Sequence, residues 1–121
     1  MAYEIPGFSF TLVAGEALAQ FRFVKVHTDG TARYADNGEW GIGVVQNSPT
    51  TGEAATVVHN GIVFVEAGGT IANGAQVAAD ADGKAIAGAT ADAVLGVCLT
   101  AAADGEYATV LLTSRPVVVP A

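Results

Sequence analysis

The hexapeptide GEAATV at residues 52–57 returns as GEYATV at residues 105–110, 53 positions later. At the same offset the match extends outward, so that residues 15–61 align with residues 68–114 without a gap. Two gapless copies indicate one supersecondary unit that is used twice. Turn residues and apolar positions recur between the copies, whereas no candidate catalytic residue does. The duplication therefore favours a scaffold or binding surface over an enzyme.

The first copy begins with a stretch that is typical of a β-strand. Apolar and polar residues alternate over 21–28 (FRFVKVHT), and a slip of phase at 23–24 predicts a β-bulge. The Asp-Gly pairs at 29–30 and 82–83 predict tight turns, and Asn-Gly at 60–61 predicts a further hairpin. Each copy is therefore expected to be a series of short strands joined by turns.

These signals predict an all-β fold. The 15 glycines and the short, turn-bounded strands are typical of a small β-barrel or sandwich, here a β-tulip-like body built from two tandem β repeats. Residues 87–93 and 100–103 have helix propensity without an apolar stripe, so at most one or two short helices are expected. The pattern leaves open whether the copies form one barrel or two small sheets.

A chain of 121 residues is expected to be one domain. We expect an N-terminal arm at 1–14, a β domain at 15–114 and a C-terminal tail at 115–121. The arm is apolar enough to dock, either onto its own domain or onto a neighbour. The tail, RPVVVPA, is bracketed by prolines, which suits an edge or docking strand.

Charge and composition restrict the classes of partner. Lys and Arg total 5 against 12 Asp and Glu, which gives a net charge of −7. This balance disfavours nucleic acid and anionic membranes and suits a basic or neutral protein partner. Because Ala and Val dominate the apolar residues, a single chain is expected to have a thin core and to self-associate. The sequence shows no secretory signal and no apolar run of the ~20 residues that a membrane helix needs. We therefore expect folding in a cytoplasm.

The residue types that carry chemistry do not form a recognisable set. His27 and His59 are the only histidines, and their counterparts in the second copy are Asp80 and Leu112, so no metal site is predicted. Cys98 stands where the first copy has Val, which indicates a small core residue rather than a nucleophile. Nucleophile-elbow, P-loop and dinucleotide-binding motifs are absent from the sequence. We predict no cofactor, no metal and no enzymatic activity.

Two features suggest contacts between chains. Trp40 is the only Trp, and its counterpart is Ala93; core packing is the favoured interpretation, and an interface contact is the alternative. The tail places three apolar residues between prolines, and these need cover from their own subunit or from a neighbour: Val117, Val118 and Val119.

Two longer segments carry a family resemblance. GGTIANGAQV at 68–77 and LGVCLTAAADGEYATVLL at 95–112, together with the Asp-Gly turn, resemble the capsid decoration (cement) proteins of tailed bacteriophages. The resemblance implies a small β-rich fold, commonly trimeric, on the outside of a phage head at local threefold positions. It also implies the major capsid protein as partner and neither catalysis nor a cofactor.

The leading hypothesis is a virion protein that binds the outer surface of a phage head and stabilises it. A few arm residues are assigned to capsid contact on the basis of their expected exposure: Tyr3, Ile5, Pro6, Phe8 and Phe10. The alternatives are a carbohydrate-binding or other surface module, a small tail or shell subunit, and a small hydrolase. Only three dispersed aromatics could serve a carbohydrate site: Trp40, Tyr34 and Tyr107.

Overall fold

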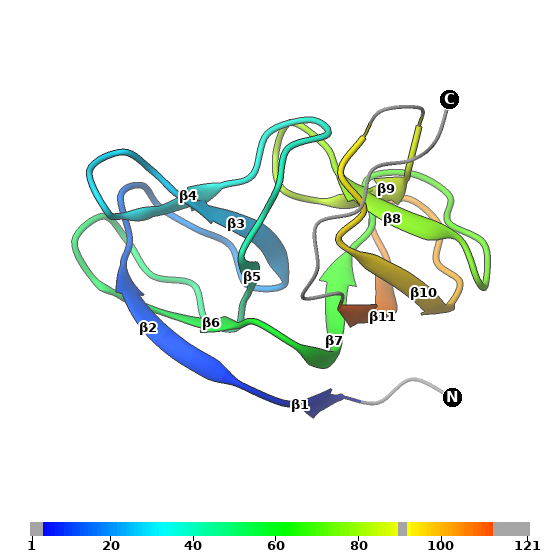
Figure 1. Ribbon diagram of the computed structural model, residues 1–121, viewed down its shortest axis with the longest axis horizontal. Coiled ribbons are helices and arrows are strands. Elements are labelled where there is room, and N and C mark those ends of the chain that lie inside the picture. Colours follow the sequence, from blue (N-terminus) through cyan, green and yellow to red (C-terminus); the bar gives the residue numbers. More distant parts are fainter. Residues whose placement is uncertain (1–3, 90–91, 113–121) are drawn as a thin grey trace.

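The computed structural model describes residues 4–89 and 92–112, and these residues form strands and turns without a helix. They make two antiparallel sheets that lie side by side (Figure 1). The strands are β1 (Ile5–Pro6), β2 (Ser9–Val13), β3 (Arg22–Val26), β4 (Ala32–Tyr34), β5 (Gly43–Val45), β6 (Ala54–Val58), β7 (Gly61–Glu66), β8 (Gln76–Ala79), β9 (Ala85–Ala87), β10 (Gly96–Thr100) and β11 (Tyr107–Leu112). The all-β prediction is confirmed.

The two sheets have the same internal order. One runs β2-β6-β5-β3-β4, and the other runs β7-β11-β10-β8-β9 with β1 added at its edge. Each strand of the first sheet therefore corresponds to a strand of the second, 53 residues later. The correspondence includes β2 and β7, whose sequences SFTLV and IVFVE differ too much to reveal it.

Each sheet curls back on itself without closing into a barrel. An isolated parallel bridge joins Ala14 to Ala32 in the first repeat, and the equivalent bridge joins Ala67 to Ala85 in the second. A single bridge is too little pairing for a closed ladder, so the fold is sandwich-like. This resolves the choice that the sequence left open in favour of two small sheets.

The hydrophobic core is shared between the repeats. A smaller buried cluster lies within the first repeat and includes Leu18 and Val24. A larger cluster fills the second repeat and continues into the first through Phe23, Val44 and Val58. Phe23 is the largest fully buried side chain among the described residues. The two repeats therefore pack as one body.

The β-bulge predicted at residues 23–24 is wrong. β3 pairs with β4 and β5 in continuous register, yet Phe23 and Val24 are both buried. Adjacent strand residues point to opposite faces, so burial of both means that β3 is covered on both faces. The observed register shift lies in β10, between Cys98 and Thr100.

The hairpin predicted at Asn60-Gly61 is also wrong. The strands on either side, β6 and β7, lie in different sheets and do not pair. The segment instead links one repeat to the next, and the Asn60 side-chain oxygen accepts a hydrogen bond of 2.6 Å from the Phe8 N–H. The Asp-Gly pairs, in contrast, lie in the turns between β3 and β4 and between β8 and β9, as predicted.

Candidate interaction surfaces

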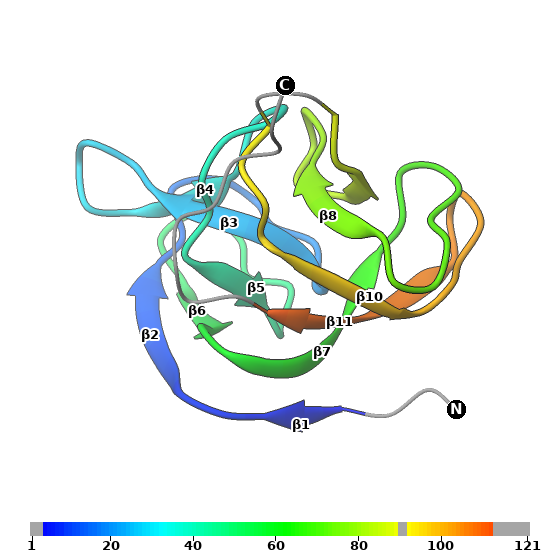
Figure 2. The same cartoon turned by 45° about the vertical axis from the view of Figure 1, so that its right-hand side comes forward.

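The N-terminal arm is bound to its own domain. β1 pairs with β7, and β2 pairs with β6 along its whole length, so the arm adds a strand to each sheet and runs beneath both (Figure 2). The Glu4 carboxylate accepts a hydrogen bond of 3.0 Å from the Phe64 N–H. Of the two docking alternatives, the arm docks onto its own subunit, because its backbone pairs with strands of that subunit.

The side chains of the arm remain available for contact. Phe8 is 60% exposed, and Ile5 and Pro6 are exposed as well. The ring of Phe8 stacks on that of Phe10 with centroids 5.8 Å apart, and the His59 ring makes an edge-type contact with each, at centroid distances of 6.4 and 6.5 Å. The result is a small aromatic surface held on rigid strands. Tyr3, which was assigned to the same surface, lies outside the described residues.

Backbone hydrogen bonds and one acidic residue hold the repeats together. The Glu66 carboxylate lies 3.3 Å from Arg22 of the first repeat and 3.7 Å from Lys84 of the second. Within the part of the chain that the structure describes, four backbone bonds cross between the repeats: Phe23 N–H to Gly83 O, Glu66 N–H to Phe21 O, Gly38 N–H to Ala79 O and Ala93 N–H to Gly38 O. The repeat interface is thus specific as well as apolar.

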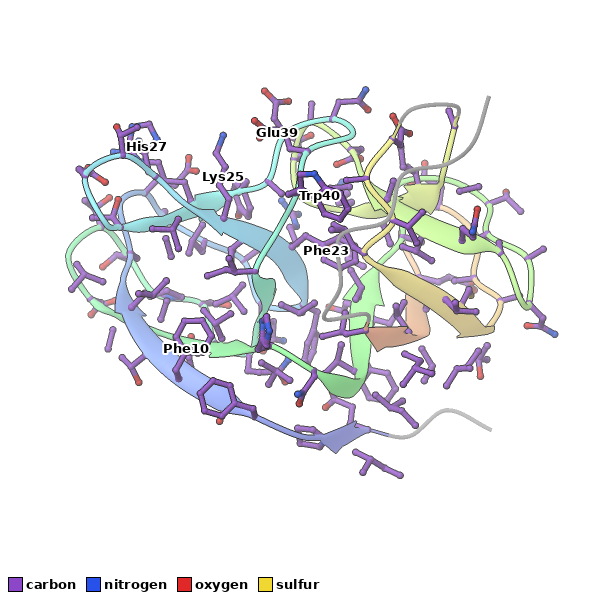
Figure 3. All side chains as sticks on the ribbon, viewed as in Figure 1. Phe10, Phe23, Lys25, His27, Glu39 and Trp40 are labelled. Carbon is purple, nitrogen blue, oxygen red and sulfur yellow. The ribbon has the colours of Figure 1, made fainter. Side chains whose placement is uncertain are left out.

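Trp40 does not pack in the core. It is 42% exposed, and the preceding residue, Glu39, forms an ion pair of 2.8 Å with Lys25 (Figure 3). The favoured prediction is therefore wrong. Its counterpart Ala93 is buried, because that position of the second repeat lies against Gly38 of the first. The contact alternative for Trp40 stays a prediction, as it does for Val117, Val118 and Val119, which lie outside the described residues.

The outer face of the second sheet is a further apolar surface. Val97 of β10 is directly opposite Leu111 of β11, and the two side chains are 38% and 44% exposed. Leu99 and Tyr107 lie exposed on the same two strands. Sequence reasoning missed this surface because the strands are apolar enough to suggest a core. The sequence offers no signal for it, because β10 (GVCLT) alternates in burial but not between apolar and polar residue types.

The titratable residues have structural roles where the geometry shows one. Cys98 is buried, as predicted, and burial raises the pKa of its thiol, which makes it a poorer nucleophile. The carboxylates of Glu53 and Glu106 accept equivalent hydrogen bonds of 2.7 and 2.8 Å from Thr50 N–H and Ala103 N–H. Both acids therefore fix turns, and the bond to Thr50 lowers the pKa of Glu53.

No ligand site is built among the described residues. Residues 4–89 and 92–112 contain no group of three potential metal ligands, and none of them forms a helix able to cross a membrane. The cavity lined by Phe23, His59 and Leu95 holds about 10 Å³, which is room for about one water molecule. What the structure does present is a β-sheet module with exposed apolar surfaces, which are typical of sites of protein–protein contact.

Comparison with known proteins identifies the kind of module. A family model described as phage cement protein matches residues 6–113, and the chain belongs to this family. It is a structural protein of the phage virion that decorates the capsid. In fold, the chain is similar to the N base of the head fiber protein gp8.5 of bacteriophage phi29, with a TM-score of 0.76 and 20% sequence identity. The similarity covers 91% of this chain and 97% of that chain. No curated protein sequence matches the chain.

Proposed function

We propose that the chain binds the outer surface of a phage head through its N-terminal arm and stabilises the shell. The observation that carries the proposal is the aromatic pair of exposed Phe8 and half-buried Phe10, which is presented to solvent although the strands of the arm are paired. An exposed apolar group on rigid strands loses little conformational entropy when it binds. The major capsid protein is the partner.

Charge supports a protein partner of neutral or basic surface. The net charge of −7 opposes binding to other acidic surfaces and gives long-range attraction to basic ones. The arm contacts are assigned to Ile5, Pro6, Phe8 and Phe10, with Tyr3 as a further member of the set. The chain folds in the host cytoplasm before it joins the virion, and the role requires no catalytic group.

We also propose that the chain acts as a trimer. A local threefold position on a head presents three equivalent binding sites, so three arms on one trimer bind with an effective concentration that a single arm lacks. The small, Ala- and Val-rich core of each repeat leaves apolar surface that self-association would cover.

Purified protein mixed with undecorated heads of the parent phage tests the proposal. We expect co-sedimentation with the heads and an increase in the temperature at which they release their DNA. Phe8→Glu should weaken head binding at least about tenfold, because it places a charge in the contact. Thr70→Glu adds the same charge at an exposed position between β7 and β8 and is the matched control. The assignment would be contradicted if the heads bind neither the parent chain nor Phe8→Glu, or if they bind Phe8→Glu as tightly as the parent chain.

A further inference from the structure

The repeats hold each other through two different faces. The first repeat contributes a sheet face made by Phe23, Val44 and Val58, all of which are buried. The second repeat contributes a turn face made by the residues that form its inter-repeat backbone bonds: Glu66, Ala79, Gly83 and Ala93. Because the two faces differ, the contact is heterologous, and duplication must leave one unused copy of each.

The unused sheet face lies on the second repeat. The counterparts of Phe23, Val44 and Val58 at the 53-residue offset are Gln76, Val97 and Leu111, and all three are exposed. We call these three residues the open sheet face. Exposed Leu99 on β10 extends it. Equivalent positions of the two sheets are thus buried in the first repeat and exposed in the second.

The unused turn face lies on the first repeat. Its members are the counterparts of the four bonded residues, and all are exposed: Val13, Val26, Gly30 and Trp40. We call these four residues the open turn face. Three of them are among the large apolar side chains that the described residues expose.

We propose that a second copy of this chain docks its open turn face onto the open sheet face, repeating between chains the contact that the two repeats make within one. The occupant is inferred from the internal interface, in which Ala79 of the turn face shares the apolar cluster of Phe23, Val44 and Val58, and Gly83 accepts the backbone bond of Phe23. This inference rests on the proposed self-association and names its surfaces.

The residue sizes at the two open faces compensate each other. Inside the chain, bulky Phe23 shares an apolar cluster with small Ala79, and small Ala93 donates a backbone bond to Gly38 of the first repeat. Between chains, Gln76 replaces the bulky aromatic, and the facing positions become larger, as Val26 and Trp40. A close-packed interface needs this exchange, because a loss of volume on one side must be filled from the other.

Two single variants and their mixture test the inference. Val97→Glu damages only the open sheet face, and Val26→Glu damages only the open turn face. Since both side chains are exposed, each variant should fold with the unfolding midpoint of the parent chain. We expect each variant alone to self-associate at least about a hundredfold more weakly, as for a central interface residue. A one-to-one mixture should regain pairing, since each variant retains the face that the other lacks. Native mass spectrometry of the parent, each variant and the mixture measures this.

The outcomes separate this inference from head binding. Phe8→Glu is the control, because it should lose head binding and self-associate like the parent chain. A parent chain that is monomeric at its highest soluble concentration, or a mixture that pairs no better than either variant alone, would overturn the head-to-tail contact. A chain truncated after Leu112 that no longer associates would assign the contact to the tail and overturn it as well. Head binding by the parent chain would survive any of these results.

Discussion

Gly83→Ala measures how strongly the second repeat depends on its contact with the first, and Gly30→Ala is its control within the same molecule. The two glycines occupy equivalent turns with φ of 73° and 83°, in the left-handed region. Alanine should cost about 1–2 kcal/mol at either position for the backbone alone. A methyl group at Gly30 would meet nothing within 4 Å, whereas at Gly83 it would lie 2.5 Å from the Phe23 carbonyl oxygen.

That backbone oxygen can move away only if the repeats separate. Overpacking costs about 1–3 kcal/mol, and the 2.7 Å bond from the Phe23 N–H to the Gly83 oxygen would weaken at a cost of about 1 kcal/mol. We therefore expect Gly83→Ala to lose about 2–4 kcal/mol more unfolding free energy than Gly30→Ala. Urea unfolding, followed by circular dichroism at a protein concentration low enough for the chain to be monomeric, gives both values without a contribution from Gly30 in the open turn face. Equal losses at the two glycines would refute the view that this contact supports the fold.

Three further predictions concern charge, the buried thiol and pH. Glu66→Gln should lower the unfolding free energy by about 1 kcal/mol in low salt and by less in 1 M salt, because it removes the partner of Arg22 and Lys84; a loss that salt does not change would contradict this. Cys98→Val, which installs the residue of the first repeat, should keep the unfolding free energy within about 1.5 kcal/mol of that of the parent chain. Cys98→Ser should lower it by about 1–3 kcal/mol. If urea unfolding shows Cys98→Val to be the less stable variant, that is evidence against a core role. Hydrogen bonds lower the folded pKa of three carboxyl groups below ordinary values of 3.8 for Asp and 4.5 for Glu: Asp29, Glu39 and Glu53. Their contribution is present above the ordinary pKa and is lost as pH falls through the lowered one, so a thermal midpoint that does not fall in this acidic range would show that the bonds do not stabilise the fold.

The repeated local structure could be predicted from the sequence, because it depends on neighbouring residues. The Asp-Gly turns and the acid that fixes each second turn recur at the 53-residue offset, and the structure places them equivalently. The correspondence of β2 with β7 was hidden, since strand pairing needs only apolar alternation and tolerates different residues. The arm's attachment was likewise left open, because pairing with β6 and β7 depends on distant strands.

Exposure could not be predicted, because it depends on what the other repeat covers. Val44 and Val97 are the same residue at the same strand position, after the same Gly, yet one is buried and the other is 38% exposed. Nothing local distinguishes them. The same reason explains Trp40, whose size suggested a core position while the structure leaves its face uncovered. A tandem repeat makes this ambiguity unavoidable, because each contact face is present in both repeats but is buried in only one of them.

The internal and the open faces differ, and the difference fits the order in which their contacts would form, first within one chain and then between chains. The repeats are joined by the short link at residues 59–60, so their contact forms within one chain and at high effective concentration. A contact between chains has no such link and must overcome lost translational freedom. If an open face were as apolar as the internal one, free chains would associate before assembly, because large exposed apolar patches promote association. Gln76 in place of Phe makes the open sheet face more polar than the internal one. The contact inside the subunit is therefore the stronger one. Each open face provides a weaker version of it, so binding between chains becomes strong only when several copies join.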